Sequence, residues 1–152
     1  MRQGSGPQTI ETITVIGAGT MGHGIAQVAG ASAFRVLLSD VDRDALARGI
    51  RAIEKNLAKG IQGGKLTEED RKRTLQQIHG TTSLEEGAAS DLIIEAAPEK
   101  LNLKQDILRQ LEALSDRPFI FASNTSSLSI TEIAKASQRP ENVIGDAFIV
   151  RE

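Results

Sequence analysis

Three glycines near the start of the chain stand at a spacing that suits phosphate binding. Gly17, Gly19 and Gly22 form G-x-G-x-x-G within the stretch VIGAGTMGHG. In such a turn the first glycine permits a tight bend, the second lets the backbone approach a pyrophosphate, and the third lets a helix lie close to a strand. The helix that follows offers unpaired N–H groups and a partial positive charge to the phosphates. The motif therefore predicts that residues 17–22, including Ala18, Thr20 and Met21, bind the pyrophosphate of a dinucleotide.

An acidic residue at the end of the next apolar run strengthens this prediction. Asp40 closes the stretch FRVLLSD, roughly 20 residues after the glycines, where a carboxylate accepts hydrogen bonds from an adenosine ribose. Asp42 adds a second negative charge that repels a 2′-phosphate, so the pattern favours NAD over NADP, although Arg43 argues in the other direction. The alternative is that Asp40 and Asp42 only cap the following helix.

Two polar clusters in the second half of the chain are further candidates. One is DLIIEAAPEKLNLK, which contains Glu99 and Lys104, and the other is ASNTSSLSITEIA, which contains Asn124 and Ser126. Both follow predicted strands, and ligands of open α/β sheets bind outside the carboxyl ends of the strands. The alternative is structural: Ser127 or Ser129 as N-cap, Asn124 as a turn residue, and Glu99 with Lys104 as a solvated helical pair.

Alternating apolar runs and helical patterns must position these side chains. The predicted strands cover residues 12–17, 34–40, 78–83, 91–97, 119–124 and 143–150, and the predicted helices cover 20–31, 42–59, 67–77, 100–114 and 129–136. This alternation predicts an α/β fold, a doubly wound parallel sheet with helices on both faces. The helices between residues 42 and 77, with Thr67 as an N-cap, are longer than a crossover requires and predict a protruding arm.

Composition narrows the class of protein. The 152 residues carry a formal net charge of −2 and no cysteine, so nothing favours nucleic acid, an anionic membrane, a disulfide or a thiolate metal site. There is no bilayer-spanning apolar run or secretion signal, so we expect a cytoplasmic protein. His23 and His79 lack ligand partners at helical spacing, and no metal site is predicted. We expect a flexible tail over residues 1–9 and one domain over 10–152.

Three motifs together resemble the NAD-binding domain of the L-3-hydroxyacyl-CoA dehydrogenase family, especially its bacterial 3-hydroxybutyryl-CoA members. They are IGAGTMGHGIAQVAG, DLIIEAAPEKLNLK and SNTSSLSITEIA, and the segment GGKLTEED also fits. The resemblance implies a Rossmann-type fold, NAD as cofactor, and oxidation of a 3-hydroxyacyl-CoA to the 3-ketoacyl-CoA, as in fatty acid β-oxidation. It further implies that the helical arm helps to clasp coenzyme A, with Lys59 and Lys65 as candidate contacts.

The resemblance also assigns roles to single residues. Glu99 and Lys104 would lie beside the nicotinamide half of the cofactor. Asn124 would help to position the nicotinamide and the substrate, and Ser126 would hydrogen-bond the reacting oxygen of the substrate.

The end of the chain departs from the family. Where the family has Gly-Met-His-Phe-Phe-Asn-Pro, this chain has GDAFIVR, which puts Ala147 at the position of the catalytic histidine. The resemblance implies that a helical domain belongs after Glu152 and that the chain is truncated, deliberately cut or frameshifted. One extra G before the codons for Met-His gives GAT GCA, the codons for Asp-Ala, which motivates the frameshift hypothesis. The DNA beyond the codon for Gly145 would decide it.

Two other functions stay open. The absence of the histidine favours a non-catalytic NAD(H)-binding module, and a dehydrogenase of another hydroxy acid has the same fold. A purely structural role leaves the glycine turn and Asp40 without a purpose. Because the family's second domain would cover apolar surface, we also expect homo-oligomers or domain-swapped self-association.

Overall fold

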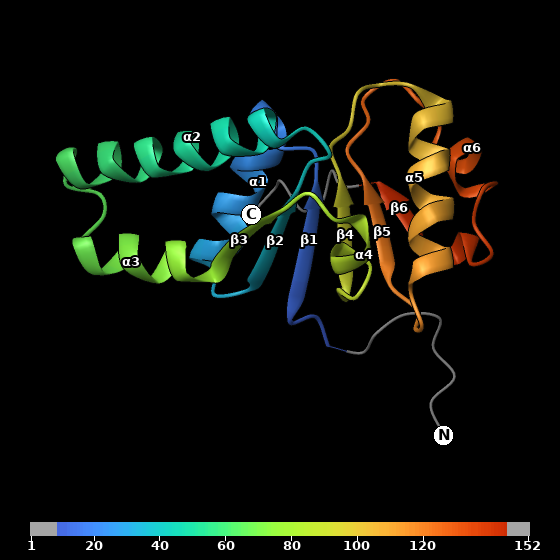
Figure 1. Ribbon diagram of the computed structural model, residues 1–152, viewed down its shortest axis with the longest axis horizontal. Helices are drawn as coiled ribbons and strands as arrows, with labels where there is room; N and C mark the ends of the chain where they lie inside the picture. Colours follow the sequence, from blue (N-terminus) through green and yellow to red (C-terminus); the bar gives the residue numbers. More distant parts are fainter. Residues whose placement is uncertain (1–8, 146–152) are drawn as a thin grey trace.

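A single six-stranded sheet forms the centre of the molecule. The computed structural model describes residues 9–145 (Figure 1). All strands are parallel, and their order is β3-β2-β1-β4-β5-β6. The strands are β1 (Thr12–Ile16), β2 (Arg35–Ser39), β3 (Ile78–Thr81), β4 (Leu92–Glu95), β5 (Ile120–Ser123) and β6 (Val143–Gly145). This is the order of the Rossmann fold, and it confirms the predicted doubly wound sheet.

Helices cover both faces of the sheet. They are α1 (Thr20–Ala31), α2 (Arg43–Gln62), α3 (Glu68–Gln77), α4 (Leu84–Gly87), α5 (Leu101–Leu114) and α6 (Ile130–Ala134), with a 3-10 turn at Pro140–Asn142. In Figure 1, α1 to α3 lie on the left of the sheet, α4 lies in front of β4, and α5 and α6 lie on the right. Leu84 of α4 packs in the same cluster as α5. The chain therefore changes faces between β3 and β4, so β1 and β4 meet at the point where the strand order reverses.

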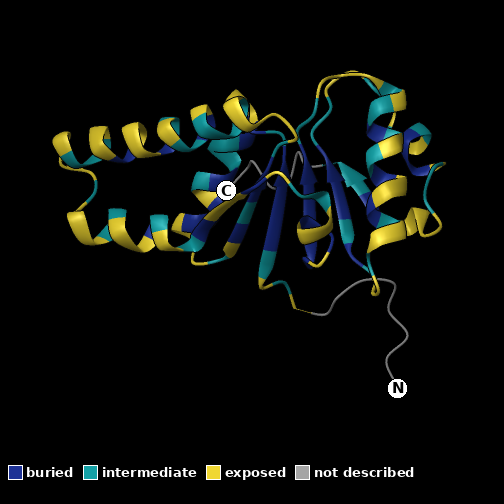
Figure 2. Cartoon of the chain, in the orientation of Figure 1, coloured by how far each residue is buried: buried dark blue, intermediate teal, exposed yellow. Residues whose placement is uncertain are grey.

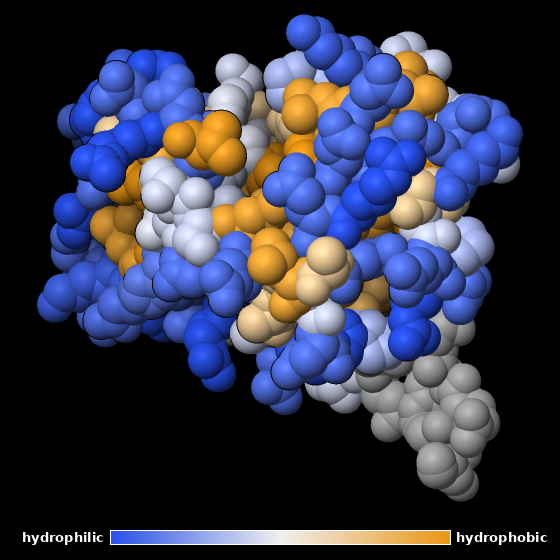
Figure 3. Space-filling model, turned by 45° about the vertical axis from the view of Figure 1, so that its right-hand side comes forward, coloured by the Kyte–Doolittle hydropathy of each residue, from blue (hydrophilic) through white to orange (hydrophobic). Residues whose placement is uncertain are grey.

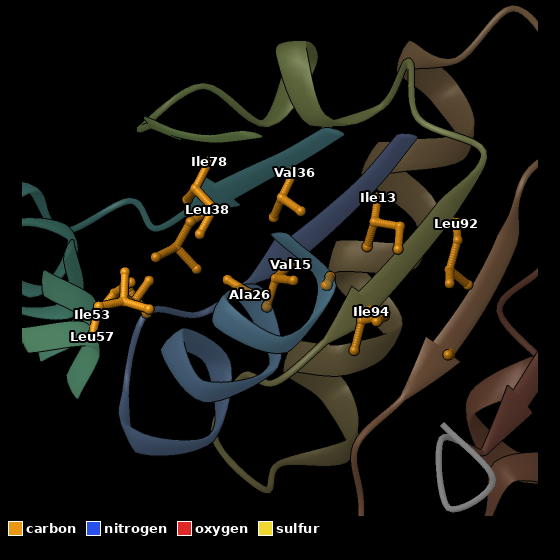
Figure 4. Packing of buried hydrophobic residues seen from close by; sticks show 13 residues of the cluster. Ile13, Val15, Ala26, Val36, Leu38, Ile53, Leu57, Ile78, Leu92 and Ile94 are labelled. Atoms are coloured by element: carbon orange, nitrogen blue, oxygen red, sulfur yellow. The ribbon is translucent and has the colours of Figure 1, made fainter. Parts of the chain in front are cut away.

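The apolar runs that predicted the strands fill two separate clusters. Ile13 and Val15 of β1 belong to the cluster under α1 and α2, whereas Ile16 belongs to the cluster under α5. Figure 4 shows side chains of β1, β2 and β4 gathered against Ala26 of α1 and Ile53 of α2. Because the central strands are covered on both faces, they need continuous apolar runs, which is the pattern in the sequence.

The predicted arm is present. Helices α2 and α3 extend away from the sheet, and Figure 2 shows that their outer turns are largely exposed. Thr67 caps α3 as predicted, because its hydroxyl accepts a hydrogen bond from Asp70 N at 3.0 Å while the Asp70 carboxylate accepts one from Thr67 N at 2.9 Å. Helix α2 continues past its predicted end at Lys59 and stops at Gln62.

One element was missed, and two predictions fall largely outside the described residues. The one-turn helix α4 was missed, although Ser83 caps it by accepting a hydrogen bond from Glu86 N. The last strand, predicted over 143–150, is described only as Val143–Gly145, and residues 146–150 lie outside the described part of the chain. The predicted tail over residues 1–9 likewise falls almost wholly outside it.

The described helices include none long and apolar enough to cross a membrane. Figure 3 shows a face on which hydrophobic residues gather in the middle and hydrophilic residues border them. The large hydrophobic side chains with the greatest exposure are those of Met21, Val28, Val41 and Leu114. Self-association through apolar surface stays a prediction.

Candidate functional site

The carboxyl ends of four strands form one edge where the predicted site residues gather. Ile16 of β1 is in register with Ser39 of β2 and with Glu95 of β4, and Glu95 is in register with Ser123 of β5. The glycine turn, Asp40, the Glu99 segment and the Asn124 segment each begin within a few residues of this row. The sheet therefore brings all four groups to the edge at which ligands of this fold bind.

Gly17 and Gly22 make the close contacts that the motif predicts. Gly17 has φ +102°, a conformation that side chains disfavour, and its N–H donates to Ser39 O at 2.7 Å. A Cβ at Gly22 would stand only 1.6 Å from Gly17 O, so α1 lies against the turn at a distance that only glycine allows.

Gly19 differs from its neighbours because a Cβ there would meet no atom within 4 Å. It is the N-cap of α1, and no side chain caps this helix start. The first N–H groups of a helix have no partner within the helix, and here they belong to Thr20 and Met21, both exposed. Open space beside free N–H groups and a helix dipole fits a pyrophosphate, with Ala18 buried just before them.

Asp40 and Asp42 have different partners. Asp40 accepts hydrogen bonds from Ala18 N and Asp42 N, both at 2.9 Å, and does not cap α2. Asp42 is the N-cap of α2, with Asp44 N and Ala45 N as donors. Asp42 therefore caps α2 as the alternative proposed, whereas that alternative is wrong for Asp40, whose carboxylate accepts a hydrogen bond from the glycine turn.

Glu99 organises the loop after β5. One of its carboxylate oxygens accepts hydrogen bonds from the Thr125 hydroxyl at 2.7 Å, from Ser126 N at 3.0 Å, and from both Ser127 N and the Ser127 hydroxyl. The hydrogen bond from Thr125 has the largest effect on the pKa of Glu99. Together the hydrogen-bond donors outweigh the partial burial of the carboxylate and lower this pKa to about 2. Glu99 is thus ionised at neutral pH and fixes the segment that carries Ser126.

Lys104 is buried, so the structural alternative of a solvated pair with Glu99 is wrong, while the placement of both residues beside the nicotinamide stays a prediction. Its side chain is fully covered, and its ammonium contacts the equally covered carboxylate of Glu95, donates to Ala97 O at 3.0 Å, and lies 3.5 Å from Glu99. Glu95 was not singled out from the sequence. The available signal was a charged residue that ends the apolar run DLII.

Asn124 and Ser126 follow the end of β5. The backbone N–H of Asn124 donates to Glu95 O at 2.8 Å and so holds Asn124 at the edge of the sheet. Asn124 is half-buried there. Ser126 is exposed, and its hydroxyl makes no hydrogen bond with the described residues. Ser129 caps α6, as the structural alternative proposed for one of the serines. Ala147 lies outside the described residues.

Comparison with known proteins decides the family. Residues 12–150 match the model of the family described as 3-hydroxyacyl-CoA dehydrogenase, NAD binding domain. The chain belongs to this family. It is the NAD-binding domain, and NAD is its cofactor, as predicted from the glycine turn.

Individual relatives agree with this assignment. The chain is 43% identical over 139 residues to 3-hydroxyadipyl-CoA dehydrogenase of Escherichia coli, covering 91% of this chain and 29% of that protein. It is 43% identical over 140 residues to 3-hydroxybutyryl-CoA dehydrogenase of Bradyrhizobium diazoefficiens, covering 92% and 48%. The crystal structure of (S)-3-hydroxybutyryl-CoA dehydrogenase from Ralstonia eutropha superposes with a TM-score of 0.86 at 39% identity, covering 90% and 48%. The chain therefore spans half or less of these relatives.

A cavity of about 220 Å³ in the NAD-binding domain lies away from this edge. Arg117, Pro118 and Phe119, which precede β5, line it together with Glu112, Ser115, Asp116, Gln138 and Arg139. It therefore lies at the amino ends of the strands, opposite the glycine turn. No part of the predicted cofactor site contributes to it.

The stability of the NAD-binding domain should fall in acid partly through Glu99. Hydrogen bonds from Thr125, Ser126 and Ser127 lower the pKa of this carboxyl group from 4.5 to about 2. Its contribution to stability is therefore complete above about pH 4.5 and is lost as the pH falls from about 4.5 to about 2. We expect the thermal midpoint of Glu99→Gln to change less than that of the parent chain across this interval. Parallel pH profiles of the two proteins would contradict this role.

Proposed function

We propose that this domain binds NAD with the pyrophosphate at the start of α1 and the adenosine ribose at Asp40. The observation that carries the proposal is the open space beside Gly19, next to a helix start that no side chain caps. Gly17 and Gly22 hold the turn in shape, while Ala18, Gly19, Thr20 and Met21 lie where backbone can approach phosphate oxygens. Asp40 lies on the β2 side of the turn, so the nicotinamide half extends toward β4 and β5.

The acidic charges at the end of β2 favour NAD(H) over NADP(H). Asp40 and Asp42 both lie at this corner, and Asp42 is exposed. A 2′-phosphate added to the ribose beside Asp40 would approach a carboxylate, and repulsion of about 1–2 kcal/mol corresponds to a roughly 5- to 30-fold loss of affinity. Arg43 is exposed and forms no ion pair with the described residues.

The reaction that this domain serves is the oxidation of an (S)-3-hydroxyacyl-CoA, with 3-hydroxybutyryl-CoA as the proposed substrate. Relatives named for 3-hydroxybutyryl-CoA and 3-hydroxyadipyl-CoA support the substrate class. NAD, when bound, supplies the hydride acceptor. Glu99 holds the loop so that the exposed Ser126 hydroxyl is available to bond the substrate's hydroxyl oxygen, and Asn124 offers its amide to the nicotinamide and the substrate. Glu99 borders the nicotinamide half, and the fully covered Lys104 lies behind it, between Glu95 and Glu99.

In this proposal, Ala147 leaves the hydroxyl proton of the substrate without the base that the family uses. Ala147 occupies the sequence position where the family's histidine is expected, and an alanine methyl cannot accept a proton. A positioned base contributes roughly 10²–10⁴-fold to the rate. We therefore propose that this chain binds cofactor but turns over 3-hydroxyacyl-CoA very slowly. The same residue favours the second candidate, a non-catalytic NAD(H)-binding module.

Cofactor titration combined with a turnover assay tests the proposal. The chain has neither Trp nor Tyr, so NADH fluorescence can be followed without interfering protein emission. We expect saturable binding of NADH and roughly 5- to 30-fold weaker binding of NADPH. We also expect oxidation of 3-hydroxybutyryl-CoA to be slower than in full-length relatives by roughly 10²-fold or more. Turnover at the relatives' rate would overturn the argument from Ala147, and failure to bind either nucleotide would overturn the whole proposal.

A further inference from the structure

A fully buried carboxylate lies beneath the nicotinamide side of the proposed site. Glu95 is the last residue of β4, and its side chain has no exposed surface. It accepts hydrogen bonds from the Lys104 ammonium, the Ser123 hydroxyl and Ala97 N, the last at 2.7 Å. A carboxylate in such a place is stable only with several charged or polar donors, and these three donors come from three different segments.

Two of these donors, Ala97 and Lys104, connect Glu95 to the loop after β4. Ala97 precedes the Pro98–Glu99 turn, and Lys104 lies on the first turns of α5. The Lys104 ammonium binds Glu95, donates to Ala97 O at 3.0 Å, and lies 3.5 Å from the outer carboxylate of Glu99. The side chain of Lys104 is completely covered. It therefore influences the surface of the site by attracting the carboxylate of Glu99.

The third donor leads to the loop after β5. Ser123 is the last residue of this strand, and the backbone O of Glu95 also accepts a hydrogen bond from Asn124 N at 2.8 Å. Glu99 in turn binds Thr125, Ser126 and Ser127. Glu95 thus forms hydrogen bonds with both loops close to the strand ends. Farther from the sheet, Glu99 of the first loop binds residues 125–127 of the second.

We propose that Glu95 is a positioning residue that sets the shape of the nicotinamide side of the site. Its carboxylate holds Lys104 and Ser123, and thereby fixes Glu99 and residues 124–127 in one arrangement before the cofactor arrives. This inference rests on the proposed function, because it assigns residues 124–127 to the nicotinamide half. Within the part of the chain that the structure describes, neither the glycine turn nor Asp40 forms a hydrogen bond with the Glu95 carboxylate, so the adenosine half of the site does not depend on it.

The proposal predicts a selective loss of affinity. In Glu95→Gln the buried ammonium of Lys104 loses the nearer of its two charged partners and faces an amide, while Glu99 remains 3.5 Å away. The ammonium is then no longer held between the two carboxylates, so Lys104 and Glu99 lose their fixed arrangement. We expect NADH to bind about tenfold more weakly, whereas ADP-ribose, which lacks nicotinamide, keeps its affinity within about twofold. Calorimetric titration of both ligands measures the ratio directly.

Asp91→Asn is the matched control. Asp91 lies immediately before β4, at the opposite end of the strand from Glu95, and it also accepts several hydrogen bonds and an ion pair, from Glu11 N, Thr12 N and Arg117. This variant should lower the thermal midpoint without changing the NADH to ADP-ribose ratio. A merely structural role of Glu95 predicts the same behaviour for Glu95→Gln.

Milder variants keep the test decisive if Glu95→Gln does not fold. Ser123→Ala removes one donor to Glu95 and should weaken NADH about threefold with ADP-ribose unchanged, and Glu95→Asp should recover part of the loss. An unchanged ratio in folded Ser123→Ala and folded Glu95→Asp would overturn the inference. If neither ligand binds the parent chain, the proposed function fails instead, so the two failures are distinguishable.

Discussion

Replacing Gly19 by alanine should weaken NADH binding by about 10- to 100-fold while the protein remains folded. A Cβ at this position meets nothing within 4 Å in the free domain, and φ of −70° is compatible with alanine. In the proposed complex the same space is needed by the pyrophosphate. The methyl group would hold the phosphates away from the N–H groups of α1, and charge-assisted hydrogen bonds contribute about 1.5–3 kcal/mol each.

Gly24→Ala is the control for this variant. Gly24 lies in the same helix, and a Cβ there also meets nothing within 4 Å, but it is one turn away from the proposed phosphate position. Gly24→Ala should bind NADH like the parent chain. Equal affinities of the Gly19 and Gly24 variants, measured by calorimetry, would contradict a pyrophosphate beside Gly19.

Gly22→Ala should have the largest effect on folding. Its Cβ would stand 1.6 Å from Gly17 O and 2.7 Å from Gly17 C, so the first turn of α1 has to move away from the turn after β1. Forcing an atom into a filled space costs about 1–3 kcal/mol or more, and we expect the free energy of unfolding to fall by about 3 kcal/mol.

Gly24→Ala, the same control, should change the free energy of unfolding in the opposite direction. In an open helical position alanine is more favourable than glycine by about 0.8–1 kcal/mol, so Gly24→Ala should raise the free energy of unfolding. Chemical denaturation of both variants measures the difference. Similar stabilities of the Gly22 and Gly24 variants would mean that the close approach of α1 to Gly17 is not maintained in solution.

The sheet and its edge could be predicted because each strand carries its own local signal. The apolar runs TITVI and DLII are buried on both faces, and the motif spacing places Gly17 directly after the first of them. The arm was predictable because Thr67 with Asp70 marks a helix start independently of the rest of the molecule. Local signals of this kind need no knowledge of tertiary contacts.

The surroundings of Lys104 could not be predicted in the same way. An exposed and a buried lysine look alike on a helix, and its burial depends on Glu95 from a neighbouring strand and on the covering loops. Glu99 similarly was expected beside the cofactor, but its bonds to Thr125, Ser126 and Ser127 arise only when two distant loops meet. The end of α2 was misplaced because Gly60, a helix-breaking residue by propensity, lies against Leu66 at a distance that a side chain would not permit.

A crystal structure of the domain grown with NADH tests the central claim most directly. The account predicts that the pyrophosphate lies beside Gly19 against the N–H groups of Thr20 and Met21, with the adenosine ribose bonded to Asp40 and the nicotinamide over residues 124–127. A structure in which NADH is bound elsewhere, or in which this corner stays empty at saturating NADH, would contradict it.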